Sequence, residues 1–270
     1  MSFRLISFLF KFGHFLGTTP SSLHVPKLSR LKKFYYLLIF AVLTYGFIAR
    51  GVIQLRSHSR KPIIFLYIIT HVAFIGNNLA YLVRNYTMKE SWIVFLRNLE
   101  TATTLTRVQS TTTEKNSFYG GFFFVSTLYL LALTLLLWAY SQVFPNIWRN
   151  FYAEYVCSFI SFHNQFLSCV LVNMIRTRYK NLKNMVLVHF ERRRKIQLEA
   201  LKKIQYTVRS LKVTVDGYND LFGWNNLFVI CSSLAYLLHL TQGVLSRLNQ
   251  LELLALNIIS LMLITFVLVN

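Results

Sequence analysis

Long apolar runs alternate with shorter polar and basic segments along the chain. Each run is about as long as the roughly 20-residue helix that crosses about 30 Å of hydrocarbon. The runs lie at residues 34–53, 63–83, 122–144, 151–175, 222–245 and 251–270. Because helices that are apolar on every side have no face for water, this pattern predicts an all-α fold. We expect a polytopic membrane helix bundle of six transmembrane helices with cytoplasmic helical extensions, forming a single domain over 1–270.

The segments between these runs carry their own patterns. Residues 176–217 contain no Gly or Pro before Gly217 and are predicted to form a cytoplasmic helical stalk. Five apolar residues recur there at steps of 3, 4, 3 and 4, which places one stripe on a helix: Leu201, Ile204, Val208, Leu211 and Val215. The Thr/Ser-rich stretch 100–117 is predicted to be a flexible loop, and residues 1–17 an interfacial or pre-span helix.

Composition and charge agree with a membrane protein. The chain is 54% hydrophobic and 14% charged, whereas soluble domains are about 25% charged. The net charge of +20 does not indicate nucleic acid, because the basic residues lie between the spans. With a cytoplasmic N-terminus, 23 of the 29 Lys and Arg residues fall on the cytoplasmic side. The positive-inside rule therefore predicts that orientation, and we expect a multi-pass protein of the plasma membrane.

Catalytic chemistry has no basis in the sequence. The nine acidic residues are scattered, and neither a P-loop nor a metal-ligand spacing occurs, so we expect no enzyme activity, cofactor or metal. Cys157, Cys169 and Cys231 all fall in predicted spans and are expected to be buried thiols. The basic run at 191–195 could bind anionic lipid headgroups or form a solvated face.

Polar and aromatic residues within the spans are more informative. On the fourth span, two faces share the helical period, a polar one at 154, 158, 161, 165 and 168 and an aromatic one at 151, 155, 159, 162 and 166. These faces could line an aromatic ligand cavity, or they could join helices within the bundle. If the third, fourth and fifth spans converge, the predicted ligand-binding residues are Trp138, Gln142, Glu154, Tyr155, Phe162, His163, Tyr236 and His239.

The border between the stalk and the fifth span carries a family resemblance. The stretch LKVTVDGYNDLFGWNNLFVICSSLAYLL, 211–238, resembles the entry into the fifth transmembrane helix of insect gustatory receptors. The family reads Asn, two residues, Phe-Gly and then an apolar span, and Asn219, Phe222 and Gly223 match it. The cytoplasmic N-terminus, the short outer loops and the aromatic content are similar as well.

This resemblance implies a subunit of a tetrameric cation channel that a small-molecule tastant opens. It implies a ligand pocket in the outer half of each subunit and stalks that anchor a tetramer with like or different subunits. At the border itself, Asn219 and Asp220 are expected to cap the span, and Gly223 to permit close helix approach. The family signature of the seventh, pore-lining helix does not occur, so we expect the chain to lack that helix and not to conduct alone.

Two other classes share some of these features. Odorant receptors have the same architecture, and a membrane transporter would also be polytopic. Transporters more often show internal repeats or helices broken by Gly and Pro, and the sequence has neither. A G-protein-coupled receptor would place its N-terminus outside, opposite to the charge bias. The sequence therefore favours a gustatory-type chemoreceptor subunit.

Overall fold

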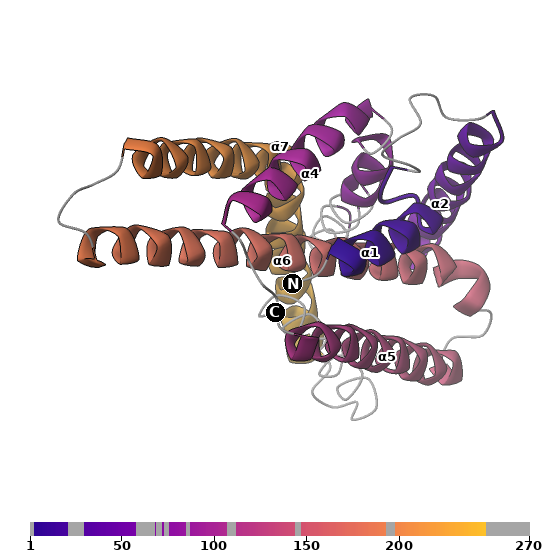
Figure 1. Cartoon of the computed structure of the whole chain (residues 1–270). Helices are drawn as coiled ribbons and strands as arrows, with labels where there is room; N and C mark the ends of the chain where they lie inside the picture. Colours follow the sequence, from indigo (N-terminus) through magenta and orange to yellow (C-terminus); the bar gives the residue numbers. More distant parts are fainter. Residues whose placement is uncertain are drawn as a thin grey trace.

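The computed structural model is helical almost throughout and contains no strand among the residues that it describes (Figure 1). Its described residues are 3–20, 30–57, 68, 72, 76–84, 87–106, 112–143, 147–192 and 198–246. The helices are, in chain order, α1 (Phe3–Phe15), α2 (Arg30–Ser57), α4 (Lys89–Leu105), α5 (Thr112–Val143), α6 (Ile147–Arg192) and α7 (Leu198–Ser246). Residues 76–84 form a further helical stretch. The all-α class predicted from the sequence is confirmed for this part of the chain.

One helical stretch among the described residues is long and apolar enough to cross a membrane by length and composition. It is Tyr155–Val188, with a mean hydropathy of 1.3 in its most apolar window. Lys33–Gly46 and Phe123–Leu135 are shorter apolar helices. The predicted span 251–270 and most of the predicted span 63–83 lie outside the described residues.

Two long helices dominate the architecture. Helix α6 has 46 residues and α7 has 49, and both run without interruption through the segments predicted as the stalk. Figure 1 shows the first part of α7 beside the last part of α6, while the later part of α7 turns away and crosses behind α6. Leu182 of α6, Leu211 of α7 and Ala102 of α4 are buried together in the stalk.

Helix α4 corrects the flexible loop predicted for 100–117. Residues up to Leu105 belong to α4, and those from Thr112 belong to α5. The most extensive helix contacts in the described part of the chain join α4 to α7. The physical reason is an apolar face at helical spacing, since Trp92, Phe95 and Leu99 are buried.

The threonines that suggested a loop are accommodated inside α4. Thr101, Thr103 and Thr106 donate their hydroxyls to the carbonyls four residues earlier, at 2.7–2.9 Å. Such bonds satisfy a Thr hydroxyl within the helix at little cost to the backbone ladder. The Thr-rich composition is therefore compatible with helix once a buried apolar face holds it.

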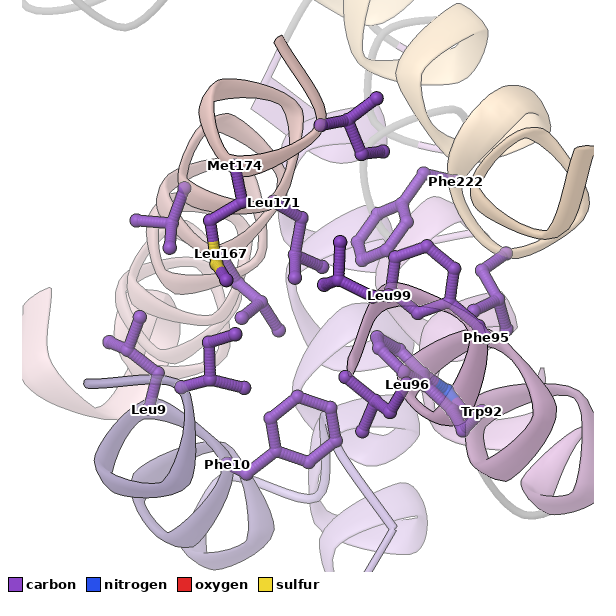
Figure 2. Packing of buried hydrophobic residues seen from close by; sticks show 14 residues of the cluster. Leu9, Phe10, Trp92, Phe95, Leu96, Leu99, Leu167, Leu171, Met174 and Phe222 are labelled. Atoms are coloured by element: carbon purple, nitrogen blue, oxygen red, sulfur yellow. The ribbon is translucent and has the colours of Figure 1, made fainter. Parts of the chain in front are cut away.

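The largest core cluster joins four helices at the level where α4 meets the bundle. Figure 2 shows Phe10 of α1 and Phe222 of α7 near the α4 side chains, with Leu167, Leu171 and Met174 of α6 opposite and Leu9 of α1 on the α6 side. The Phe10 and Trp92 rings meet edge to face at 5.1 Å. Helix α1, predicted as an interfacial or pre-span helix, thus has a face buried against the bundle.

Helix α2 approaches α6 through a glycine. A Cβ at Gly46 would lie 2.5 Å from the Cβ of Ala153 and 2.9 Å from the Tyr152 hydroxyl oxygen. The Tyr152 hydroxyl donates to the carbonyl of Val42 at 3.2 Å. Small residues at this crossing let the two backbones come close, as in helix contacts within membranes.

The stripe predicted on the stalk divides between interior and surface. Leu211 is buried and Ile204 and Val215 are half-buried, whereas Leu201 and Val208 are 40% and 48% exposed. The interior positions of α7 include three small polar residues, Thr207, Ser210 and Thr214. Their size admits α4, and Ser210 donates to the carbonyl of Asn98 on that helix at 3.4 Å.

Burial of the cysteines also differs from the prediction. Cys157 is buried, but Cys169 and Cys231 are exposed. Many large apolar side chains of α2, α5 and the later half of α7 are exposed as well, including Leu37, Leu131 and Leu234. Cys169 and Cys231 were expected inside because they lie in apolar runs, yet an apolar run that faces outward leaves its thiols on the surface.

Candidate functional site

The predicted ligand-binding residues lie on three helices. Trp138 on α5 is 63% exposed, Tyr155 on α6 is half-buried, and Phe162 and His163 on α6 are buried. The backbones of Gln142, Glu154, Tyr236 and His239 lie in α5, α6 and α7, and their side chains lie outside the described part of the structure. The described side chains do not meet in one cavity, and their role in ligand binding remains a prediction.

Phe162 packs against α5. Its ring stacks on that of Tyr129 with centroids 4.3 Å apart and planes 10° apart, and the Tyr129 hydroxyl donates to the carbonyl of Ser158. Phe159 and Phe166 follow along the same helix, with ring centroids 6.5 and 6.3 Å from that of Phe162. An aromatic array therefore runs along α6 where α5 meets it.

His163 points toward α1. Its Nε2 lies 3.2 Å from the carbonyl oxygen of Leu9, and its Nδ1 lies 3.2 Å from the Thr18 hydroxyl. A carbonyl can only accept, so Nε2 carries the proton, while the single hydrogen of the Thr18 hydroxyl has two acceptors in reach, Nδ1 and the carbonyl oxygen of Gly13 at 3.1 Å. The imidazole thus ties the N-terminal helix to the middle of α6.

The turn after α1 is built to reach His163. Gly17 has a φ of +76°, and the amides of Gly17 and Thr18 donate to the carbonyls of His14 and Gly13 at 3.1 and 2.7 Å. This is a Schellman C-cap, which favours Gly at the left-handed position. A Cβ at Gly13 would lie 2.7 Å from Cε1 of His163, so the close seat of α1 on α6 depends on glycine there.

Two serines of the predicted polar face join helices. Ser161 donates to Oδ1 of Asn78 at 3.1 Å, and the Ser168 hydroxyl lies 2.5 Å from that of Tyr218 on α7. Of the two interpretations of that face, the contacts at these positions match helix joining. In an apolar environment, where water is absent, such hydrogen bonds satisfy the polar groups of neighbouring helices.

The border between stalk and fifth span differs from expectation. Helix α7 continues through it, so Asn219 and Asp220 lie inside the helix, are exposed, and cap nothing. A Cβ at Gly223 would meet no described atom within 4 Å, so no contact within the described part of the chain depends on glycine there. The cap was expected because the polar pair Asn219 and Asp220 precedes an apolar run. Helix α7 already begins at Leu198, so the backbone N–H groups at the border have carbonyl partners in the preceding turn of the same helix. Gly217 is the glycine that faces a neighbour, since its Cβ would lie 3.5 Å from Phe95.

Phe222 is the matched residue that the structure buries. Its ring meets that of Trp92 edge to face at 5.4 Å and stacks on that of Tyr218 at 5.0 Å. Asn226 donates to the Tyr218 hydroxyl at 3.2 Å. The border is therefore the place where α7 is fastened to α4 and α6 by aromatic rings and hydroxyls.

Next to this fastening lies a small cavity. Its volume is about 10 Å³, enough for about one water-sized ligand. The cavity lies between the turn after α1, the stretch 76–84, and helices α4, α6 and α7. Its lining residues are Thr18, Tyr81, Arg84, Met88, Trp92, Asn164, Leu167, Leu221, Phe222 and Asn225.

Most polar groups around the cavity are paired. Asn225 donates to the carbonyl of Leu221 at 3.3 Å and also pairs with Tyr81. Arg84 donates through one Nη2 hydrogen to the carbonyl of Asp220 at 2.6 Å. The side chain of Asn164 is 1% exposed, and its Nδ2 has no hydrogen-bond partner in the described part of the chain.

The sequence analysis did not single out Asn164 or Arg84. Asn164 belongs to neither the polar nor the aromatic face assigned to the fourth span, and Arg84 was counted only as a loop charge. A signal did exist, because an Asn within an apolar run must meet a polar partner in the bundle. The partner itself follows only from the packing of α1, α4 and α7.

Comparison with known proteins adds no family to this geometry. No protein-family model and no curated protein matches the chain.

Proposed function

We propose that the chain is a gustatory-receptor-type chemoreceptor subunit that binds a small-molecule tastant. It acts in the plasma membrane as a multi-pass protein with six spans and a cytoplasmic N-terminus. It assembles with like or different subunits into a tetramer that works as a ligand-gated cation channel. The resemblance at Asn219, Phe222 and Gly223 is the source of this proposal.

The observation that carries the proposal is the continuity of α6 and α7. Each helix joins an apolar segment to a basic one without a break, and residues 176–217 hold 12 of the 29 Lys and Arg residues. A basic, helical extension directly after apolar spans supports a cytoplasmic stalk. The aromatic fastening of Phe222 supports a structural role for the residues that resemble the family.

Exposed apolar surface supports the membrane assignment. The exposed side chains of α2, α5 and later α7 include Leu37 at 66%, Leu131 at 55% and Leu234 at 55%. Such a broad apolar exterior is a liability in water and a natural surface in lipid. This supports spans in α2, α5 and the later part of α7, in addition to the long apolar stretch Tyr155–Val188.

The stalk offers a surface for assembly. Leu201 and Val208 are seven residues apart on one side of α7 and are both exposed. Two turns of exposed apolar residues on a helix suit a seam with a second helix. In the proposed tetramer these residues contact the stalk of a neighbouring subunit.

The tastant pocket is proposed at the outer ends of the third, fourth and fifth spans. Its residues are those predicted from the sequence, with Phe162 and His239 as the test pair. In cells that give a ligand response, Phe162→Ala or His239→Ala should change that response more than surface expression. If both variants reduce surface expression and response in parallel, these residues serve bundle packing instead.

The function is tested by recording from cells that have no endogenous receptor. The full chain is expressed alone and together with a seven-helix gustatory receptor, and a tastant panel is applied. We expect the chain to reach the surface and to change the current or the tastant selectivity of the partner. Substrate uptake without ligand-evoked current would indicate a transporter, and a chain that neither associates nor alters current would overturn the proposal.

A further inference from the structure

The cavity beside Asn164 has a chemistry of its own. Asn164 is buried on α6 and lines a space with room for about one small ligand, and its amide nitrogen, which carries two N–H donors, has no hydrogen-bond partner in the described part of the chain. A buried donor without an acceptor costs about 1–3 kcal/mol, so a native fold normally supplies one.

The remaining lining groups do not supply that acceptor. The Thr18 hydroxyl is engaged with Gly13 and His163, and the Asn225 side chain with Leu221 and Tyr81. The other lining residues are Arg84 and five apolar side chains. The acceptor therefore has to come from outside the lining.

The charge of the lining residues favours an anion over a cation as the ligand. Arg84 is the one charged residue that lines the cavity, and no described lining residue carries a carboxylate. Its guanidinium has five N–H donors, one of which goes to the carbonyl of Asp220. A cation would face the positive charge of Arg84, whereas an anion would be attracted by that charge and could accept the N–H donors of Asn164.

Access is available on one side. Arg84 and Met88 are half-buried, while Asn164 is buried, so the cavity opens toward the surface at the end of the stretch 76–84. The space of about 10 Å³ is room for about one water-sized ligand, and a monatomic halide is closer to that size than the polyatomic phosphate or carboxylate. Size and charge together therefore restrict the ligand.

We propose that this cavity is a binding site for one monatomic anion, chloride in the cell, held between the Asn164 amide and the Arg84 guanidinium. The ion joins the turn after α1, the stretch 76–84, α6 and α7, and it is distinct from the tastant pocket. The site requires only that the fold forms, so it does not depend on the receptor assignment.

The test uses the purified full chain in lipid nanodiscs. Sodium chloride is exchanged for sodium gluconate at constant ionic strength, and the midpoint of thermal unfolding is followed by tryptophan fluorescence. We expect a saturable rise of the midpoint with chloride and a similar rise with bromide. Asn164→Leu should abolish the dependence, and Arg84→Gln should weaken halide binding about tenfold or more, because a bond to a charged group is lost.

Matched variants control for general salt effects. The control variants are Asn173→Leu, at an exposed position of α6, and Arg97→Gln, at an exposed position of α4. Both should keep the full chloride dependence. In a bromide-soaked crystal, an anomalous peak should lie within hydrogen-bond distance of the Asn164 amide.

Three results would overturn the proposal. The first is a natural chain that unfolds cooperatively with the same midpoint in chloride and gluconate. The second is an undiminished chloride dependence in Asn164→Leu. The third is an ordered water alone in the cavity at high bromide.

Discussion

The hydroxyl of Tyr218 lies 2.5 Å from that of Ser168, which fastens α7 to α6 at the border between the stalk and the apolar part of both helices. The same tyrosine stacks on Phe222 and accepts a hydrogen bond from Asn226. One side chain thus combines ring packing with two polar contacts. Its ring and its hydroxyl can be separated by substitution.

Tyr218→Phe should lower the free energy of unfolding by about 1 kcal/mol, because it keeps the ring and loses the hydroxyl. Ser168→Ala should cost a similar amount, and the double variant should cost clearly less than the two together. Denaturant unfolding in detergent measures all three. Tyr206→Phe, at an exposed position of α7, is the control and should change stability by less than about 0.5 kcal/mol. Fully additive losses would show that the two hydroxyls are not coupled.

Gly13→Ala should loosen α1 from the bundle. The new Cβ would lie 2.7 Å from Cε1 of His163 and 2.7 Å from Cγ2 of Thr19, and overpacking of this kind costs about 1–3 kcal/mol. Limited proteolysis should then cut near α1 sooner than in the natural chain. Gly121→Ala provides the matched control, since its Cβ meets open space among the described residues. Equal proteolysis of both variants would contradict the close seat of α1.

Removing the hydrogen-bond partner of Arg178 should destabilise the protein more than removing the Arg178 charge itself, as expected of a buried cation. It is fully buried, its Nε donates to the Thr103 hydroxyl at 3.1 Å, and its Nη2 has no partner in the described part of the chain. Thr103→Val removes an acceptor and should destabilise by about 1–3 kcal/mol, whereas Arg178→Met removes the charge and should cost less or stabilise. Thermal unfolding compares them, with exposed Lys180→Met as control. A larger loss in Arg178→Met would mean that the cation has a counter-charge.

Leu201→Ser and Val208→Ser together should reduce association without unfolding the chain. Both side chains are exposed, so folding should change by less than about 0.5 kcal/mol per site. Crosslinking in membranes followed by mass analysis should show fewer tetramers. Val213→Ser is the control, because Val213 is exposed on another side of α7. Unchanged association would remove these two residues from the proposed interface.

Membrane orientation can be tested by glycosylation in microsomes. Asn85 belongs to the sequence Asn-Tyr-Thr and should stay unmodified, because the basic bias places it in the cytoplasm. An acceptor inserted in a lengthened 54–61 loop should be modified. The inserted acceptor carries the test, since Asn85 lies close to a predicted span. The reverse pattern would overturn both the orientation and the resemblance to gustatory receptors.

The helical class was predictable because apolar runs of this length leave few alternatives. Helix α4 was not predicted, since threonine-rich composition outweighed an apolar spacing that only becomes stable once α7 covers it. The cap assigned to Asn219 failed for a related reason, because a helix boundary depends on the preceding turn as well as on the local pair. These errors arise where tertiary packing overrides local preference.

The candidate site was less accessible to sequence analysis. His163 was singled out, but its partners Leu9 and Thr18 are 154 and 145 residues away in the chain. Asn164, directly beside it, was overlooked because periodicity assigns a face and not a neighbour. Only the packing of α1 against α6 determines which of these polar groups are satisfied.

The indole of Trp92 touches both Phe10 of α1 and Phe222 of α7. Helix α1 begins at Phe3, so a group attached at the start of that helix lies close in the chain to Phe10 and its contact with Trp92. A bulky fluorescent protein or a capture tag at that end would disturb the packing of α1 against α4 and, through Trp92, the packing of α4 against α7. Reporter experiments on this protein are therefore better served by a label on an exposed stalk position such as Lys202.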